Sequence, residues 1–195
     1  MIPQPSGIES CARVINSDRR ECGWGTPPSL YSIYSALLPR VGRWRAGMLS
    51  TVAWPIPGDL FAIDPIVILT SMGKSLIKGR GHPIQQFARR CAGPAFAGIA
   101  FATESKVDFI GNPGERERSS DASTVCILDC SGRYTVLCEL KDGRLRIDNS
   151  EDQPDITESE PEVAAAIRNI TLGILHHCPD GTADLERIRG VGVAS

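Results

Sequence analysis

Two turn signals divide the stretch Thr124–Ile147, TVCILDCSGRYTVLCELKDGRLRI, into three short runs in which apolar and polar residues alternate. Alternation with a period of two residues, bounded by Gly, Asp and Ser, is typical of strands that are joined as β-hairpins. The stretch therefore predicts two consecutive hairpins of an antiparallel sheet.

The register of each hairpin follows from its turn. Asp142-Gly143 favours a two-residue type I′ loop, which pairs Leu140 with Leu145. The other turn, Cys130-Ser131-Gly132, suits a three-residue loop whose glycine is left-handed. Both registers together predict one buried face, made of Cys126, Leu128, Tyr134, Val136, Cys138, Leu140, Leu145 and Ile147.

A central strand is predicted upstream of the hairpins. Ala95–Thr103, AFAGIAFAT, is nearly continuous in apolar residues, as is expected of a strand that is covered on both faces. Gly98 in its interior indicates that another segment packs closely against it. The polar stretch Gly111–Ser123, GNPGERERSSDAS, is expected to be a surface loop.

Apolar residues with a period near 3.6 predict amphipathic helices on either side of the sheet segments. We expect these helices over residues 28–38, 65–78, 83–92 and 160–177, with a short strand over residues 49–54. Helices, then hairpins, then a helix is the order of an α+β domain, in which helices cover an antiparallel sheet. The fold class predicted is α+β, with a hairpin meander covered by amphipathic helices in a single domain.

One of these helices contains Gly73-Lys74-Ser75, the last part of a phosphate-binding loop motif. The complete motif needs a glycine at position 68, where this chain has Ile68, and a β-branched residue resists the inward-turned backbone that holds phosphate. Asp64 is a suitable N-cap, and Pro65 occupies the first helical position that proline favours. We interpret the segment as a helix and not as a nucleotide site.

Length and composition favour one globular domain. The chain has 195 residues, of which 42% are hydrophobic and 23% charged, and its net charge is −2. We expect an irregular N-terminal arm over residues 1–25, a single α+β domain over 26–178 and a C-terminal tail over 179–195. Because no secretory signal or apolar run of membrane-spanning length is seen, we expect a cytoplasmic protein with no membrane contact.

The seven cysteines are expected to be reduced thiols, because they are odd in number and the chain is long enough to build a core. Three of them, Cys126, Cys130 and Cys138, could bind a metal together with His176-His177-Cys178. A structural zinc site normally needs closely spaced pairs on tight knuckles, which this spacing does not supply. We therefore expect core thiols, an exposed Cys130 on its turn, and no metal or cofactor.

An enzymatic alternative rests on Glu104, which follows the predicted central strand. There it could act as a general acid or base with Asp108 or His82, as in a small hydrolase-like enzyme. The structural interpretation, which we favour, is that polar residues mark the point where the strand leaves the core. No complete catalytic set of residues can be assembled from the sequence.

A basic cluster that includes an aromatic residue precedes the helix expected over residues 65–78. It consists of Arg40, Arg43, Trp44 and Arg45, and a second cluster contains Arg80, His82, Arg89 and Arg90. A solvated surface is the first interpretation. Protein binding is the second, because Arg and Trp are frequent hot-spot residues, and nucleic-acid binding is the third, because the net charge is negative.

The layout from Ala95 to Ile147 carries a resemblance to a known group. An apolar strand that ends in Thr103-Glu104 is followed by a polar loop and by two hairpins marked Cys-Ser-Gly-Arg and Lys-Asp-Gly-Arg. This layout resembles uncharacterised small α+β proteins of actinobacteria and their phages. The resemblance implies an accessory or regulatory role, and together with the missing catalytic set it favours a non-enzymatic protein that binds another protein.

Overall fold

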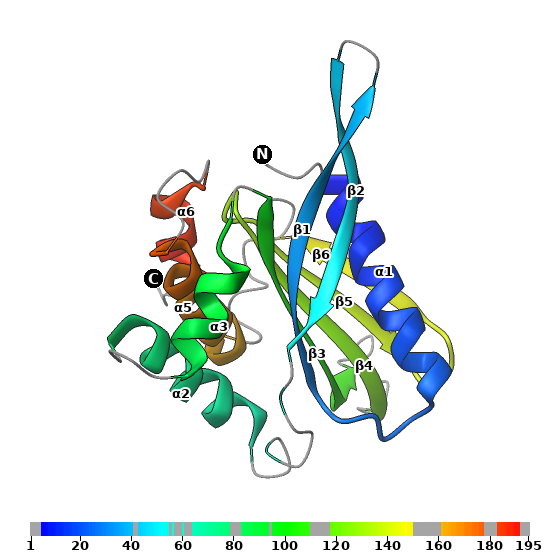
Figure 1. The fold of residues 1–195 in the computed structure, drawn as a ribbon. Helices are drawn as coiled ribbons and strands as arrows, with labels where there is room; N and C mark the ends of the chain where they lie inside the picture. The colour runs from blue at the N-terminus through cyan, green and yellow to red at the C-terminus, as the bar shows by residue number, and fades with distance from the viewer. Residues whose placement is uncertain are drawn as a thin grey trace.

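The computed structural model describes residues 5–40, 43–54, 56, 60, 64–78, 83–93, 95–109, 118–149, 161–177 and 183–191. Figure 1 shows the strands and helices of these segments. The strands are β1 (Ser29–Arg40), β2 (Arg43–Ala53), β3 (Phe96–Phe109), β4 (Arg118–Asp129), β5 (Tyr134–Leu140) and β6 (Leu145–Asn149). The helices are α1 (Pro5–Cys22), α2 (Pro65–Lys78), α3 (Pro83–Cys91), α5 (Pro161–Leu175) and α6 (Leu185–Gly190).

The strands form one antiparallel sheet in the order β2-β1-β3-β4-β5-β6, which confirms the predicted α+β class. The predicted central strand is also confirmed, because β3 lies between β1 and β4. Gly98 of β3 permits a close approach: a Cβ atom at this position would lie 2.5 Å from the carbonyl oxygen of Leu128.

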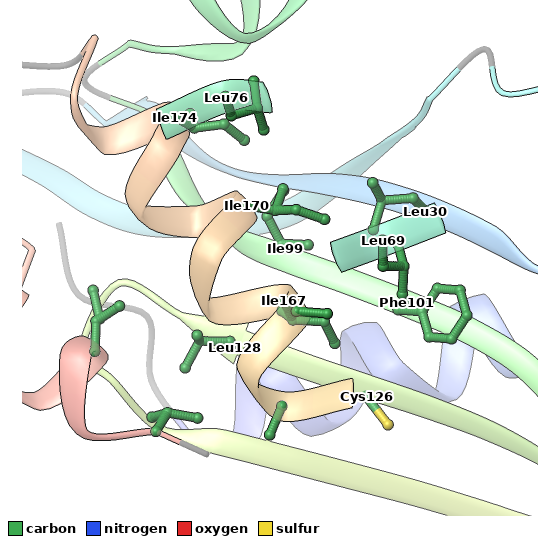
Figure 2. Close-up of a cluster of buried hydrophobic side chains, with 14 of the residues drawn as sticks. Leu30, Leu69, Leu76, Ile99, Phe101, Cys126, Leu128, Ile167, Ile170 and Ile174 are labelled. Carbon is green, nitrogen blue, oxygen red and sulfur yellow. The ribbon is translucent and has the colours of Figure 1, made fainter. Parts of the chain in front are cut away.

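Helices cover both faces of the sheet (Figure 1). On one face, α2 and α5 pack over a cluster of large apolar side chains, part of which is drawn in Figure 2: Leu30, Leu69, Leu76, Ile99, Phe101, Leu128, Ile167, Ile170 and Ile174. On the other face, α1 packs over a second cluster: Ile8, Cys11, Ala12, Ile15, Ile33, Ala97, Ala100, Ala102, Val125, Ile127 and Leu137. The sheet is therefore the middle of three layers.

The prediction of an irregular N-terminal arm is wrong for the described residues, because α1 spans most of it. Ile8, Ala12 and Ile15 lie on one side of the helix and have at most 2% exposed surface. Arg19 on its last turns is buried as well, and its guanidinium donates to the carbonyl oxygens of Thr26 and Pro27 at 2.9 and 2.8 Å. The helix is therefore fixed both to the sheet and to the segment that follows it.

The prediction of a helix over residues 28–38 is also wrong, since this segment is β1. Its apolar residues serve opposite faces of the sheet: Leu30 belongs to the cluster under α2 and α5, and Ile33 to the cluster under α1. The short strand predicted over 49–54 is part of the longer β2. The helices predicted near 65–78, 83–92 and 160–177 are confirmed as α2, α3 and α5.

The first hairpin of the meander follows the prediction and the second does not. Between β4 and β5, Leu128 pairs with Tyr134, and Gly132 is left-handed with φ 78°. Between β5 and β6, Glu139 pairs with Leu145, a register that differs by one residue from the predicted one. The loop has three residues, because the amide of Leu140 donates to the carbonyl of Arg144 at 2.8 Å.

This change of register moves the residues of β6 to the other face of the sheet. Leu145 has an exposed fraction of 42%, and Ile147 packs against the cluster under α1. The surface loop predicted over 111–123 is wrong for residues 118–123, which begin β4. None of the helices in the described segments is both long and apolar enough to span a membrane.

Candidate functional site

The four residues of the predicted basic patch lie in the hairpin of β1 and β2, and not in a connector between a helix and a strand. Pairing of β1 with β3 ends at Tyr34, whereas pairing with β2 continues through Pro39↔Trp44 to Arg40↔Arg43. The outer part, Leu37–Arg40 with Arg43–Ala46, is therefore a two-stranded ribbon, which we call the β1–β2 ribbon. Figure 1 shows it projecting beyond the rest of the sheet.

The register groups the basic positions of this ribbon. Residues that pair directly occupy the same side of a two-stranded ribbon, and so do residues two apart along a strand. Leu38 pairs with Arg45, so Arg40, Arg43 and Arg45 occupy positions on one side. Trp44, which pairs with Pro39, occupies the opposite side.

The second predicted basic cluster is described only in part. Arg89 and Arg90 are exposed in the last turn of α3. Arg80 and His82 lie outside the described residues.

Glu104, the candidate acid or base, holds the connection between α1 and β1. Its carboxylate accepts hydrogen bonds from the backbone amides of Gly25 at 2.8 Å and Thr26 at 3.3 Å. Gly25 has φ 88°, a left-handed conformation that glycine adopts without steric cost. Of the two proposed partners, His82 and the side chain of Asp108 lie outside the described part. The contacts of Glu104 are thus structural ones.

The cysteines of the meander belong to the core or lie half-buried. Cys126 and Cys130 have exposed fractions of 1% and 4%. The prediction of an exposed Cys130 is wrong, because its turn is covered by α6 and its Sγ lies 3.5 Å from the carbonyl oxygen of Phe96. Cys138 is half-buried, and Cys178 lies outside the described residues.

Two histidines follow the end of α5. The ring centroids of His176 and His177 are 5.4 Å apart, with the planes at 70°. Burial, with smaller contributions from Arg89 and His176, lowers the pKa of His177. Within the described segments, no three His, Cys, Asp or Glu side chains are arranged to hold a metal ion.

A cavity of about 520 Å³ lies where the N-terminal ends of α2 and α5 meet the sheet. We call it the α2–α5 cavity. Its described lining residues are Asp64, Pro65 and Ile66 of the α2 end, Phe101, Thr103, Glu104 and Ser105 of β3, Cys126 of β4, and Glu162 and Val163 of α5. Figure 2 shows Phe101 and Cys126 beside the first turn of α5, at one end of the large cluster.

No local pattern in the sequence indicates this cavity. In the sequence, Asp64 is recognisable only as the N-cap of a helix, Glu162 only as part of a predicted helix, and Cys126 as a core residue of a strand or a candidate metal ligand. Their convergence depends on how α2 and α5 pack against each other, which periodicity within a single segment does not encode. A comparison of the chain with protein-family models, with curated proteins and with solved structures found no match in any of the three.

Proposed function

We propose that the protein is a non-enzymatic accessory or regulatory protein that binds an acidic surface of another protein through the β1–β2 ribbon. The observation that carries the proposal is the extension of the pairing Leu37↔Ala46 to Arg40↔Arg43 beyond the end of the β1–β3 pairing. This extension places three arginine positions on one side of a projecting ribbon.

Physical considerations favour a partner for such a ribbon. An isolated two-stranded hairpin is marginally stable in water, so contact with a second surface stabilises it. Arg and Trp are the residue types that contribute most often to binding hot spots, and a group of like charges accelerates association with a surface of opposite charge. An acidic protein surface would stabilise the ribbon, offer contacts to its Arg and Trp residues, and attract its positive charge.

The contacts of Glu104 support the non-enzymatic part of the proposal. A general base must be within hydrogen-bond reach of the proton that it removes. Both oxygens of this carboxylate already accept backbone N–H groups of Gly25 and Thr26. The two oxygens therefore stabilise the connection between α1 and β1, which is a structural role.

Photo-crosslinking in cells tests the proposal. A full-length chain with Trp44→p-benzoylphenylalanine is irradiated and compared with a chain that carries the same group at Val67, an exposed position of α2 with 56% exposed surface. We expect discrete protein adducts from position 44 only. The triple variant R40E/R43E/R45E should lose these adducts, because it reverses the charge of the ribbon.

Two results contradict the proposal. Adducts from position 44 that persist in the triple variant show that the arginines do not determine binding. Adducts that nuclease removes and protease does not show that the ribbon binds nucleic acid instead of protein.

A further inference from the structure

The α2–α5 cavity combines an apolar floor with an acidic rim. Phe101 and Cys126 of the sheet are each 1% exposed, and Val163 of α5 is 8% exposed. These side chains are fixed in the core, so the floor exists before any ligand arrives. A volume of about 520 Å³ lies within the range of roughly 300–1,000 Å³ that is typical of small-molecule sites.

The charged residues in the described lining of the cavity are all acidic. Its described lining residues include three carboxylates, those of Asp64, Glu104 and Glu162, and none of them is basic. The Glu104 side chain lies on the α1 side of the sheet, like that of Ala102, and its carboxylate is occupied by backbone amides there; Asp64 and Glu162, both exposed, remain to face a ligand.

The two helix ends do not cancel this negative charge. A helix N-terminus is equivalent to about half a positive elementary charge, and each carboxylate carries a full negative one. Asp64 uses one oxygen to accept the backbone amide of Ile66 at 2.8 Å, as a capping residue does. The described part of the rim is therefore net negative, which disfavours phosphates and carboxylates as ligands.

The sheet beside the cavity contains an unused hydrogen-bonding group. Thr124 pairs with the lining residue Thr103 in the sheet and lies two residues from Cys126, on the same face. It is 3% exposed, and its hydroxyl oxygen has no hydrogen-bond partner among the described residues. A buried hydroxyl without a partner costs free energy, and a polar ligand group that reached it would recover this cost.

From these observations we infer that the α2–α5 cavity binds a small organic amine: an apolar, ring-sized body lies on Phe101 and Cys126, and a protonated amine lies between Asp64 and Glu162. This site is separate from the β1–β2 ribbon and does not depend on the proposed function. The hydroxyls of Thr103 and Ser105, which also line the cavity, can fix the orientation of polar substituents.

Three indole compounds of similar size test the inference, because they differ mainly in charge: tryptamine is a cation, tryptophol is neutral and indole-3-propionate is an anion. Each is titrated into the ¹⁵N-labelled full chain, and amide chemical shifts give the dissociation constant and the location. We expect saturable shifts at Ile66, Thr103 and Val163 with tryptamine. Its affinity should exceed that of tryptophol by about fivefold for each carboxylate contacted, and indole-3-propionate should bind most weakly.

The double variant D64N/E162Q separates charge from shape. Asparagine still caps a helix, so α2 should be retained, while both negative charges are removed. We expect the affinity for tryptamine to fall to that for tryptophol. The control E186Q removes a carboxylate of α6 that is outside the cavity lining and should leave all three affinities unchanged.

A variant that fills the cavity provides an independent test of the site. Thr103→Phe places a ring in the cavity from a half-buried position of β3, and it should abolish the shifts with all three compounds while the chain remains folded. The inference is overturned if tryptamine and tryptophol bind the unmodified chain equally, if D64N/E162Q keeps the preference for the amine, or if no compound gives saturable shifts at these amides.

Discussion

Asp129, at the end of β4, is a carboxylate with no exposed surface. One oxygen accepts hydrogen bonds from the amide of Ser131 at 2.8 Å, the hydroxyl of Ser131 at 2.5 Å and the amide of Arg133 at 3.1 Å. The other oxygen is buried without a hydrogen-bond partner among the described residues. Burial raises the pKa of Asp129, and the bonds from Ser131 and Arg133 offset this only in part. Holding the turn with the Asp129 carboxylate therefore costs the free energy of burying a charged group.

This cost predicts how stability depends on pH. Because the pKa of Asp129 is higher in the folded than in the unfolded chain, its contribution to stability is full below the unfolded value, near pH 4, and is lost as the pH rises through the folded value. Asp129→Asn keeps an acceptor for the turn and removes the titration. We expect the free energy of unfolding of the variant, relative to the unmodified chain, to increase between pH 4 and pH 8, as measured by urea titration.

Asp142, in the next turn, is the matched control with the opposite sign. Hydrogen bonds from the side chain and amide of Arg144 lower its pKa, so its contribution is present above the unfolded value and is lost as the pH falls. Asp142→Asn should therefore become less stable relative to the unmodified chain as the pH rises. Equal pH profiles for the two variants would contradict the roles assigned to both carboxylates.

At the scale of the elements, α2 and α5 pack closely because each contributes a glycine at the contact. A Cβ atom on Gly73 would lie 2.8 Å from the Cβ atom of Asn169, and one on Gly173 would lie 2.5 Å from the Cβ atom of Leu76. Cβ atoms are fixed by their backbone, so neither neighbour can move aside without a shift of the helix. Gly73 in Gly73-Lys74-Ser75 is thus explained by helix packing.

Alanine substitution at these glycines tests the packing. Helix propensity alone would stabilise Gly→Ala by up to ~1 kcal/mol, whereas overpacking typically costs about 1–3 kcal/mol. We expect Gly173→Ala to be clearly destabilised in urea unfolding and Gly73→Ala to be destabilised less. Gly190→Ala in α6, where a Cβ atom would meet nothing within 4 Å, should be neutral or stabilised. Stabilisation at all three positions would rule out the close contact.

The elements that the sequence misassigns are those whose pattern suits two structures. In β1, Leu30 and Ile33 serve opposite faces of the sheet, and Ser32 is buried where its hydroxyl accepts the indole N–H of Trp54 at 2.8 Å. A strand covered on both faces need not alternate, so its apolar residues matched a helical period by chance. Similarly, Asp-Gly suits both two-residue and three-residue loops, and in this turn Gly143, with φ 88°, ends a three-residue one.

At the scale of the whole molecule, the candidate sites lie where elements distant in sequence meet. The α2–α5 cavity takes residues from two helices and two strands, and the carboxylate of Glu104 meets amides 78 and 79 positions away. Sequence periodicity predicts α2, α5 and β3 individually. The contacts between them depend on the three-layer packing, which periodicity does not predict. The basic patch differs, because its residues are neighbours in sequence. The hairpin register only determines which side of the ribbon each position occupies.

The three-layer architecture makes α1 a structural layer of the domain, and this can be tested with two adjacent residues. Ile15 is 2% exposed and packs in the cluster under α1, whereas Val14 beside it is 54% exposed. If α1 covers the sheet, Ile15→Ala should lose about 2–5 kcal/mol of unfolding free energy, as is usual for a truncated core residue, and Val14→Ala should change it by less than about 0.5 kcal/mol. Urea unfolding followed by near-ultraviolet circular dichroism measures both. If α1 did not pack on the sheet, both substitutions would have equal, small effects on the unfolding free energy. That result would contradict the assignment of α1 as a layer of the domain.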